Sequence, residues 1–166
     1  MSIIIQTQRI IIREFLADEL ETYLQHFNDE RVTLNLPKRS REERTIVFNN
    51  ALSQYLVSRY TGIWGMFDKN SHEFIGSCLL RPFTEQPGAI ELGYSIEHNY
   101  WRQGLGTEMA ITMVEHGFED PDVNAIVAVT TMDNIASQKV LEKAGLKRDG
   151  NTVRAGEELA LFRMFR

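Results

Sequence analysis

The feature of this sequence that most constrains its fold is the glycine loop QGLGTE, which connects an expected strand with an expected helix. Apolar and polar side chains alternate in residues 89–98, which is typical of a half-buried strand. The residues after the loop, up to about Gly117, are rich in apolar side chains and predict a helix. Because a further strand is expected at 124–131, this segment predicts a parallel crossover within one sheet.

The remaining patterns extend this expected fold. We expect further strands at 9–15, 62–67, 74–83 and 158–165, with a hairpin turn at 68–73. We expect further helices at 17–27, 45–58 and 134–146, the last of them capped by Gly145. The prediction is an α/β (α+β) fold with a single mixed, mostly antiparallel sheet of about seven strands and helices on both faces. No repeat or flexible linker divides the chain, so we expect one domain over residues 1–166.

Composition limits the classes of function. The chain has 166 residues, is 43% hydrophobic and carries a net charge of −5, with its Lys and Arg residues scattered. We therefore expect no nucleic-acid partner. A lone Cys78 predicts no internal disulfide and no metal cluster, and no apolar run is long enough for a signal peptide or a membrane span. We expect a cytoplasmic protein without a membrane partner.

The glycine loop has the chemistry of an anion site. Amides at the start of a helix lack intrahelical partners, and the helix dipole is positive there. Gly104 and Gly106 allow a phosphate to approach the backbone closely, although a glycine turn without a ligand explains the same local features. A nucleotide loop needs a Lys after the glycines, and a dinucleotide fingerprint needs Gly or Ala at Met109, so both are excluded.

Several motifs together resemble the GNAT superfamily of acyl-CoA-dependent N-acyltransferases, in particular its Rim-type branch. They are TQRIIIREF, IELGYSI, YWRQGLGTE and NIASQKVLEKAGL, which span nearly the whole chain. Trp101 departs from the family pattern, since a Gln or Arg is usual at its position. The resemblance implies that acetyl-CoA is the cofactor, with its diphosphate on the glycine loop and its pantetheine arm along residues 94–98. It also implies that a backbone amide near Ser95 or Ile96 polarises the thioester carbonyl. The cofactor-binding residues expected from it are Ser95, Ile96, Glu97, His98, Arg102, Gln103, Gly104, Leu105, Gly106, Thr107 and Asn134.

The expected acid is Ser137. Its hydroxyl shares a helical stripe with Val140, Leu141 and Ala144, although a serine bonded back to the carbonyl of Asp133 fits the same pattern. Rim-type enzymes carry a serine at this position, which implies that Ser137 protonates the leaving thiolate. Asn134 is expected either to contact the cofactor arm or to cap its helix, and both roles are compatible.

The expected base is Glu91 in the xELGY motif, with a solvated glutamate as the alternative. His98 is a second option as a proton relay, whereas His26 and His72 are expected at the surface. Deprotonation at pH 7 costs roughly 4–5 kcal/mol for a lysine but only about 1 kcal/mol for an α-amine, so a modest base suffices for the latter.

These observations predict an N-acetyltransferase that transfers acetyl to a primary amine by direct attack in a ternary complex. The favoured acceptor is the α-amine of a protein or peptide. Alternatives are a small amine such as a polyamine or an aminoglycoside, and a non-catalytic acyl-CoA-binding regulatory module. The family resemblance implies that residues 27–44 decide the acceptor. Oligomeric state is open, with a homodimer as one option.

Overall fold

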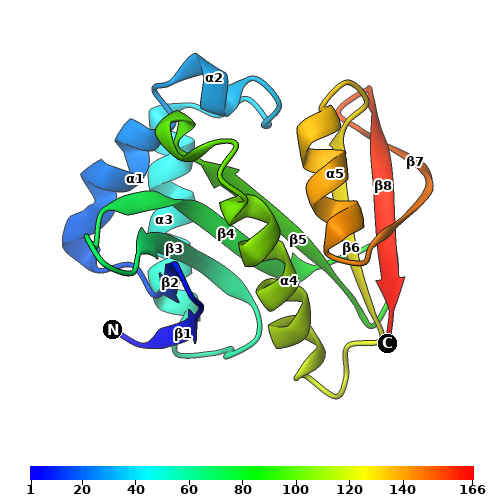
Figure 1. The fold of residues 1–166 in the computed structure, drawn as a ribbon, viewed down its shortest axis with the longest axis horizontal. Helices are drawn as coiled ribbons and strands as arrows, with labels where there is room; N and C mark the ends of the chain where they lie inside the picture. The colour runs from blue at the N-terminus through cyan, green and yellow to red at the C-terminus, as the bar shows by residue number, and fades with distance from the viewer.

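Eight strands form one twisted sheet in the computed structural model, which describes residues 1–166 (Figure 1). The strand order is β1-β2-β3-β4-β5-β6-β8-β7, and only the β5–β6 pair is parallel. The predicted fold class is therefore confirmed, with eight strands in place of about seven. The strands are β1 (Ile3–Gln6), β2 (Ile10–Arg13), β3 (Gly62–Asp68), β4 (Phe74–Pro82), β5 (Ala89–Ile96), β6 (Ala125–Thr131), β7 (Lys147–Arg154) and β8 (Glu157–Phe165).

Four of the five α-helices cover the two faces of this sheet. Helices α4 (Leu105–Phe118) and α5 (Ile135–Lys143) lie on one face, and α1 (Leu20–His26) and α3 (Arg41–Gln54) lie on the other (Figure 1). The short α2 (Glu30–Thr33) sits above the ends of the central strands. None of the helices has both the length and the apolar character needed to span a bilayer.

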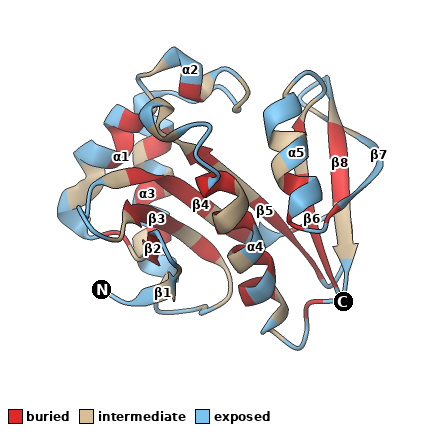
Figure 2. Ribbon diagram, viewed as in Figure 1, coloured by how far each residue is buried: buried red, intermediate tan, exposed pale blue.

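Alternation along the strands divides the core between these faces. On β3, Met66 belongs to the large cluster that packs under α4, while its neighbour Phe67 joins an aromatic cluster with α1 and α3. The period-two pattern of the sequence thus supplies both helical layers with apolar contacts. Figure 2 shows the consequence as buried stretches along the central strands.

The bounds of some helices and strands differ from the prediction. Helix α3 begins at Arg41 rather than residue 45, because Ser40 and Glu43 form a capping box with N···O distances of 3.1 and 2.7 Å. Two edge strands were not expected. Strand β1 is only four residues long, and β7 is mostly exposed and polar, with an irregular register between Arg148 and Asn151. Edge strands with this composition carry no clear apolar period.

The end of α5 follows the prediction. Gly145 has a φ of +97°, and the amide of Leu146 donates to the carbonyl of Leu141 at 3.0 Å. This is the αL termination that favours glycine after a helix. It ends α5 about two turns after Ser137.

Candidate active site

The glycine loop presents six consecutive backbone amides, from Arg102 to Thr107, that donate to no acceptor within the protein. Arg102 has a φ of +59° and Gly104 a φ of +78°, so the chain turns twice through the left-handed region before α4 starts at Leu105. No side chain caps the helix. The amides are therefore free for an external acceptor, and the positive end of α4 reinforces them.

The opening motif of the chain anchors this loop. Arg9 donates through Nη1 to the Gln103 carbonyl oxygen at 2.6 Å and through Nε to Glu108 Oε2 at 2.7 Å. Thr7 Oγ1 donates to the other oxygen of Glu108 at 2.6 Å. Burial raises the pKa of Glu108, but these hydrogen bonds outweigh it and hold the pKa below its ordinary value. Glu108 thus stays ionised and ties the loop to the edge of the sheet.

Beside the loop, β5 parts from its parallel neighbour. The two strands pair only through Ala89–Glu91 and Ala125–Val127, and they diverge beyond these residues (Figure 1). The Glu97 amide donates to the Ile75 carbonyl of β4 at 2.7 Å, and antiparallel pairing alternates direction along a strand. The amides of Tyr94 and Ile96 therefore point towards β6, where no strand partner meets them. Of the two predicted donors, Ile96 faces the opening and Ser95 faces β4.

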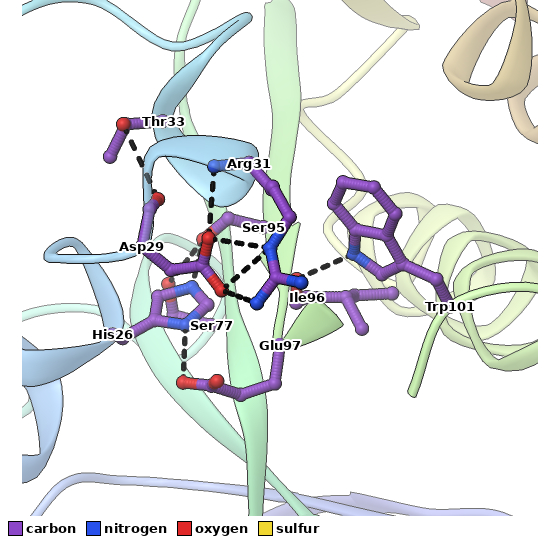
Figure 3. Close-up of polar contacts among 9 residues, drawn as sticks. All are labelled: His26, Asp29, Arg31, Thr33, Ser77, Ser95, Ile96, Glu97 and Trp101. Carbon is purple, nitrogen blue, oxygen red and sulfur yellow. Dashed lines mark hydrogen bonds and ion pairs between the residues drawn. The ribbon is translucent and has the colours of Figure 1, made fainter. Parts of the chain in front are cut away.

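Trp101 ties the loop to the end of β5. Its Nε1 donates to the Ile96 carbonyl oxygen at 2.8 Å (Figure 3). The centroid of its ring lies 4.7 Å from that of the His98 ring. The residue that departs from the family pattern thus fixes the loop against the strand. The His98 ring packs on this indole and has no hydrogen-bond partner within the protein, so its predicted relay role stays a prediction.

Ser137 lies on the inward face of α5, as its stripe predicted. Its Oγ accepts a hydrogen bond from the Tyr94 hydroxyl at 3.2 Å, and it makes no bond back to Asp133. Asn134 caps the helix by accepting from the Ser137 amide at 3.2 Å, which confirms its capping role, while its cofactor contact stays a prediction. Burial raises the pKa of Tyr94, so its hydroxyl stays protonated at neutral pH. The Ser137 hydrogen is left free to be donated elsewhere.

Glu91 is buried, so the alternative interpretation of it as a solvated glutamate is wrong. It is 5% exposed, and its oxygens accept hydrogen bonds of 2.7–3.3 Å from Arg81 and Arg154. Burial raises the pKa of Glu91, but the two arginines outweigh it and hold the pKa below its ordinary value. A carboxylate held in this way is a poor proton acceptor. The geometry gives Glu91 a structural role and does not favour it as the base.

The interpretation of His26 as a surface residue is wrong. His26 is 1% exposed and bridges two residues of the β5 end (Figure 3). Its Nδ1 lies 2.8 Å from Glu97 Oε1, and its Nε2 lies 2.7 Å from Ser95 Oγ. Burial lowers the pKa of His26, with the hydrogen bond and charge of Glu97 offsetting part of the shift, so the ring is neutral at pH 7.

Its tautomer follows from its partners. A carboxylate only accepts, so Nδ1 carries the proton towards Glu97 and Nε2 accepts from the Ser95 hydroxyl. The signal for His26 was its position three residues after Tyr23, which places it beside the apolar stripe of α1. Its partners are about 70 positions away in the chain, so only the fold brings them together.

Comparison with known proteins identifies the family. Residues 9–147 match the model of the acetyltransferase (GNAT) domain. This chain belongs to the GNAT acetyltransferase family. It is accordingly an acyltransferase that uses acetyl-CoA as its acetyl donor.

The similar proteins agree with this assignment. The uncharacterized N-acetyltransferase YoaA of Bacillus subtilis is 26% identical over 149 residues, which cover 89% of this chain and 84% of YoaA. Among solved structures, RimL, a ribosomal L7/L12 alpha-N-protein acetyltransferase in complex with coenzyme A, superposes with a TM-score of 0.81 at 17% identity, covering 99% and 98% of the two chains. The aminoglycoside acetyltransferase AAC(6')-Ib, in complex with coenzyme A and kanamycin, gives 0.74 at 18%, covering 95% of each chain. At these identities the two structures establish the shared fold.

Proposed function

We propose that this GNAT enzyme acetylates the α-amine of a protein or peptide N-terminus. The observation that carries the proposal is the buried imidazole of His26, held between Glu97 and Ser95 at the open end of β5. At pH 7 an α-amine needs about 1 kcal/mol to lose its proton and a lysine about 4–5 kcal/mol. A weak base such as this imidazole suits the former and is poorly matched to the latter.

The loop and the parted strand fit acetyl-CoA. The six free amides from Arg102 to Thr107 suit a diphosphate, and the unpaired amides of Tyr94 and Ile96 suit a pantetheine arm. Gly106 faces the same region, since a Cβ there would lie 3.4 Å from Ile96 Cδ1 and 3.5 Å from Val140 Cγ2. Bound acetyl-CoA supplies the acetyl group as a thioester.

On the α5 side of β5, Ser137 is the proposed acid. Because its Oγ already accepts from Tyr94, its own hydrogen can be donated to a developing thiolate. The Tyr94 hydroxyl then stabilises the serine oxygen from behind. Ile96 N–H is the proposed donor to the carbonyl oxygen on which negative charge develops during attack.

On the α1 side, Ser95, His26 and Glu97 form the proposed path for the amine proton. The proton passes from the acceptor to the Ser95 oxygen as the Ser95 hydrogen passes to His26 Nε2, while Glu97 stabilises the imidazolium that forms. Acid and base thus lie on opposite sides of the same strand end, one for the leaving group and one for the nucleophile.

We propose direct attack in a ternary complex, without an acyl-enzyme on cysteine. Cys78 is 1% exposed in β4, and burial raises the pKa of its thiol far above the ordinary value. It therefore has neither the access nor the thiolate that acyl transfer needs.

The charge of the residues around the proposed acceptor site favours a peptide over a polycation as the acceptor. A hollow of about 430 Å³ lies on the Ser95 face of the sheet, below the link between α2 and α3. Three arginines line it together with two glutamates. Glu91 pairs with Arg81 and Arg154, and Glu85 lies 3.8 Å from Arg154, so Arg39 is the arginine left without a carboxylate partner. Polyamines and aminoglycosides would meet net positive charge here.

The test is release of free thiol from acetyl-CoA in the presence of N-terminal peptides, polyamines and aminoglycosides. We expect turnover with peptides, and with α-amines in preference to lysine side chains. Faster turnover of a polyamine or an aminoglycoside would refute the peptide assignment. Cofactor binding without turnover of any acceptor would instead favour a regulatory module.

A further inference from the structure

A second, smaller pocket lies between the end of α1 and the start of α3. Its volume is about 80 Å³, enough for one small chemical group. It is lined by Leu24, Phe27, Asn28, Arg39, Arg41 and Arg44. Half of these residues are arginines, in a chain whose net charge is −5.

Arg44 is the unusual member of this set. It is only 9% exposed, and its guanidinium stacks 3.8 Å from the centroid of the Phe27 ring. Its side-chain nitrogens donate to no acceptor within the protein, and it takes part in no ion pair. The side chain is mostly buried, but its unpaired nitrogens still reach solvent, so its charge is not stranded in the interior. With one face covered by Phe27, the donors at the edge of the guanidinium are left for the pocket.

No acidic residue nearby forms an ion pair with Arg44, although the charge of Glu43 acts on it. Arg41 pairs with Glu21 at 2.5 Å, and Glu43 accepts the Ser40 amide in the capping box. Arg39, on the pocket wall, also has no carboxylate partner. The positive end of α3 adds to the same field. The pocket therefore has positive charge that is complementary to one anionic group.

The pocket adjoins the proposed proton path. The His26 ring packs against the Phe27 ring with centroids 4.8 Å apart, and Arg44 lies on Phe27. Arg39 lines both this pocket and the larger hollow. A molecule whose amine reached Ser95 would thus lie on the same face of the protein as these arginines.

We propose that Arg44, with Arg39 and Arg41, binds a carboxylate of the acceptor. The substrate class is then an amine that carries an acidic group, such as a peptide with Asp or Glu close to its N-terminus. A planar carboxylate matches the fork of a guanidinium that is stacked on an aromatic ring. The substrate class rests on the proposed acetylation of a peptide, whereas the pocket itself can be tested without catalysis.

The first experiment is a titration of the ¹⁵N-labelled full chain with succinate, followed by amide chemical shifts. We expect saturable shifts confined to residues near the pocket, and their loss in Arg44→Met, which keeps an apolar stem on Phe27. Arg59→Met is the matched control, because it removes the same charge from a residue that is 75% exposed and paired elsewhere. Absence of saturable shifts, or equal shifts in Arg44→Met, would overturn the site. Tighter binding of inorganic phosphate than of succinate would overturn the carboxylate assignment.

The second experiment compares two peptides that differ only by Glu or Gln near the N-terminus. We expect wild type to prefer the Glu peptide by about tenfold or more in kcat/KM, as one charge-assisted hydrogen-bonded pair provides. Arg44→Met should lose that preference through KM, with KM for acetyl-CoA unchanged, and Arg44→Lys should keep part of it. Equal use of both peptides by wild type would overturn the substrate class, even if Arg44→Met failed to fold. No turnover of any peptide would refute the proposed function instead, and the succinate titration would still decide the pocket.

Discussion

Replacement of Ser137 by alanine should separate a catalytic effect from a structural one. The structural effect arises because Tyr94 is partly buried and donates its hydroxyl to Ser137 Oγ at 3.2 Å. A buried donor left without a partner costs about 1–3 kcal/mol, so the melting temperature should fall by roughly 2–4 °C for each kcal/mol. The catalytic effect is larger, because general-acid catalysis contributes about 10²–10⁴ in rate.

The assay is kcat and KM for thiol release, with the melting temperature measured in parallel on the same samples. We expect Ser137→Ala to lower kcat by about 100-fold or more with little change in KM for acetyl-CoA. Tyr94→Phe should keep most of the activity, since Ser137 retains its own hydrogen. The double variant removes the unpaired hydroxyl and should recover stability without recovering kcat. A kcat of Ser137→Ala within about threefold of wild type would refute Ser137 as the acid, because general-acid loss is much larger.

Three further perturbations test other parts of the site. His26→Gln should lower kcat and remove the acidic limb of the pH–rate profile. In wild type the pKa of His26 is lower in the folded state than its unfolded value near 6.5. The free energy of unfolding should therefore fall as pH drops below about 6.5, by at most about 1.4 kcal/mol per pH unit. A wild-type profile without that limb would contradict the base. Gly104→Val places a branched residue at a φ of +78° and should raise KM for acetyl-CoA about tenfold or more, whereas Gly150→Val, at +74° with nothing within 4 Å, should not. Equal KM values in the two variants would remove the loop assignment. Arg154→Met should destabilise the chain by about 1–3 kcal/mol in chemical denaturation near neutral pH, because Glu91 loses one of its two partners. That loss should diminish as pH falls through the lowered pKa of Glu91. An unchanged free energy of unfolding in Arg154→Met would show that Arg81 alone satisfies the carboxylate.

The central part of the fold could be predicted from local sequence, because its signals are local. The strand at 89–98, the glycine loop and α4 follow each other within 30 residues, and each has its own period or turn residues. Ser137 and Asn134 could be placed on α5 for the same reason. The edge strand β7 could not, since KRDGNTVR is exposed and has no apolar period.

The roles of Glu91 and His26 depend on contacts with residues far away in the sequence, which no local pattern predicts. Glu91 sits opposite Arg81 across the β4–β5 register, which a hairpin prediction could give, but Arg154 comes from the far edge of the sheet. His26 meets Ser95 and Glu97 only after α1 has packed on the sheet. The sequence around each of these side chains indicated its chemical type. Its protonation state could be inferred only from the residues that contact it in the fold.

Cofactor binding at this site depends most on the free amides from Arg102 to Thr107, which we propose bind a diphosphate. Calorimetric titration of the full chain with coenzyme A and with pantetheine, which lacks the diphosphate and the adenosine 3′-phosphate attached to it, tests it. We predict that coenzyme A binds about 100-fold or more tightly than pantetheine, as several charge-assisted hydrogen bonds would provide. Equal affinities for the two ligands, or no heat with coenzyme A, would contradict the account.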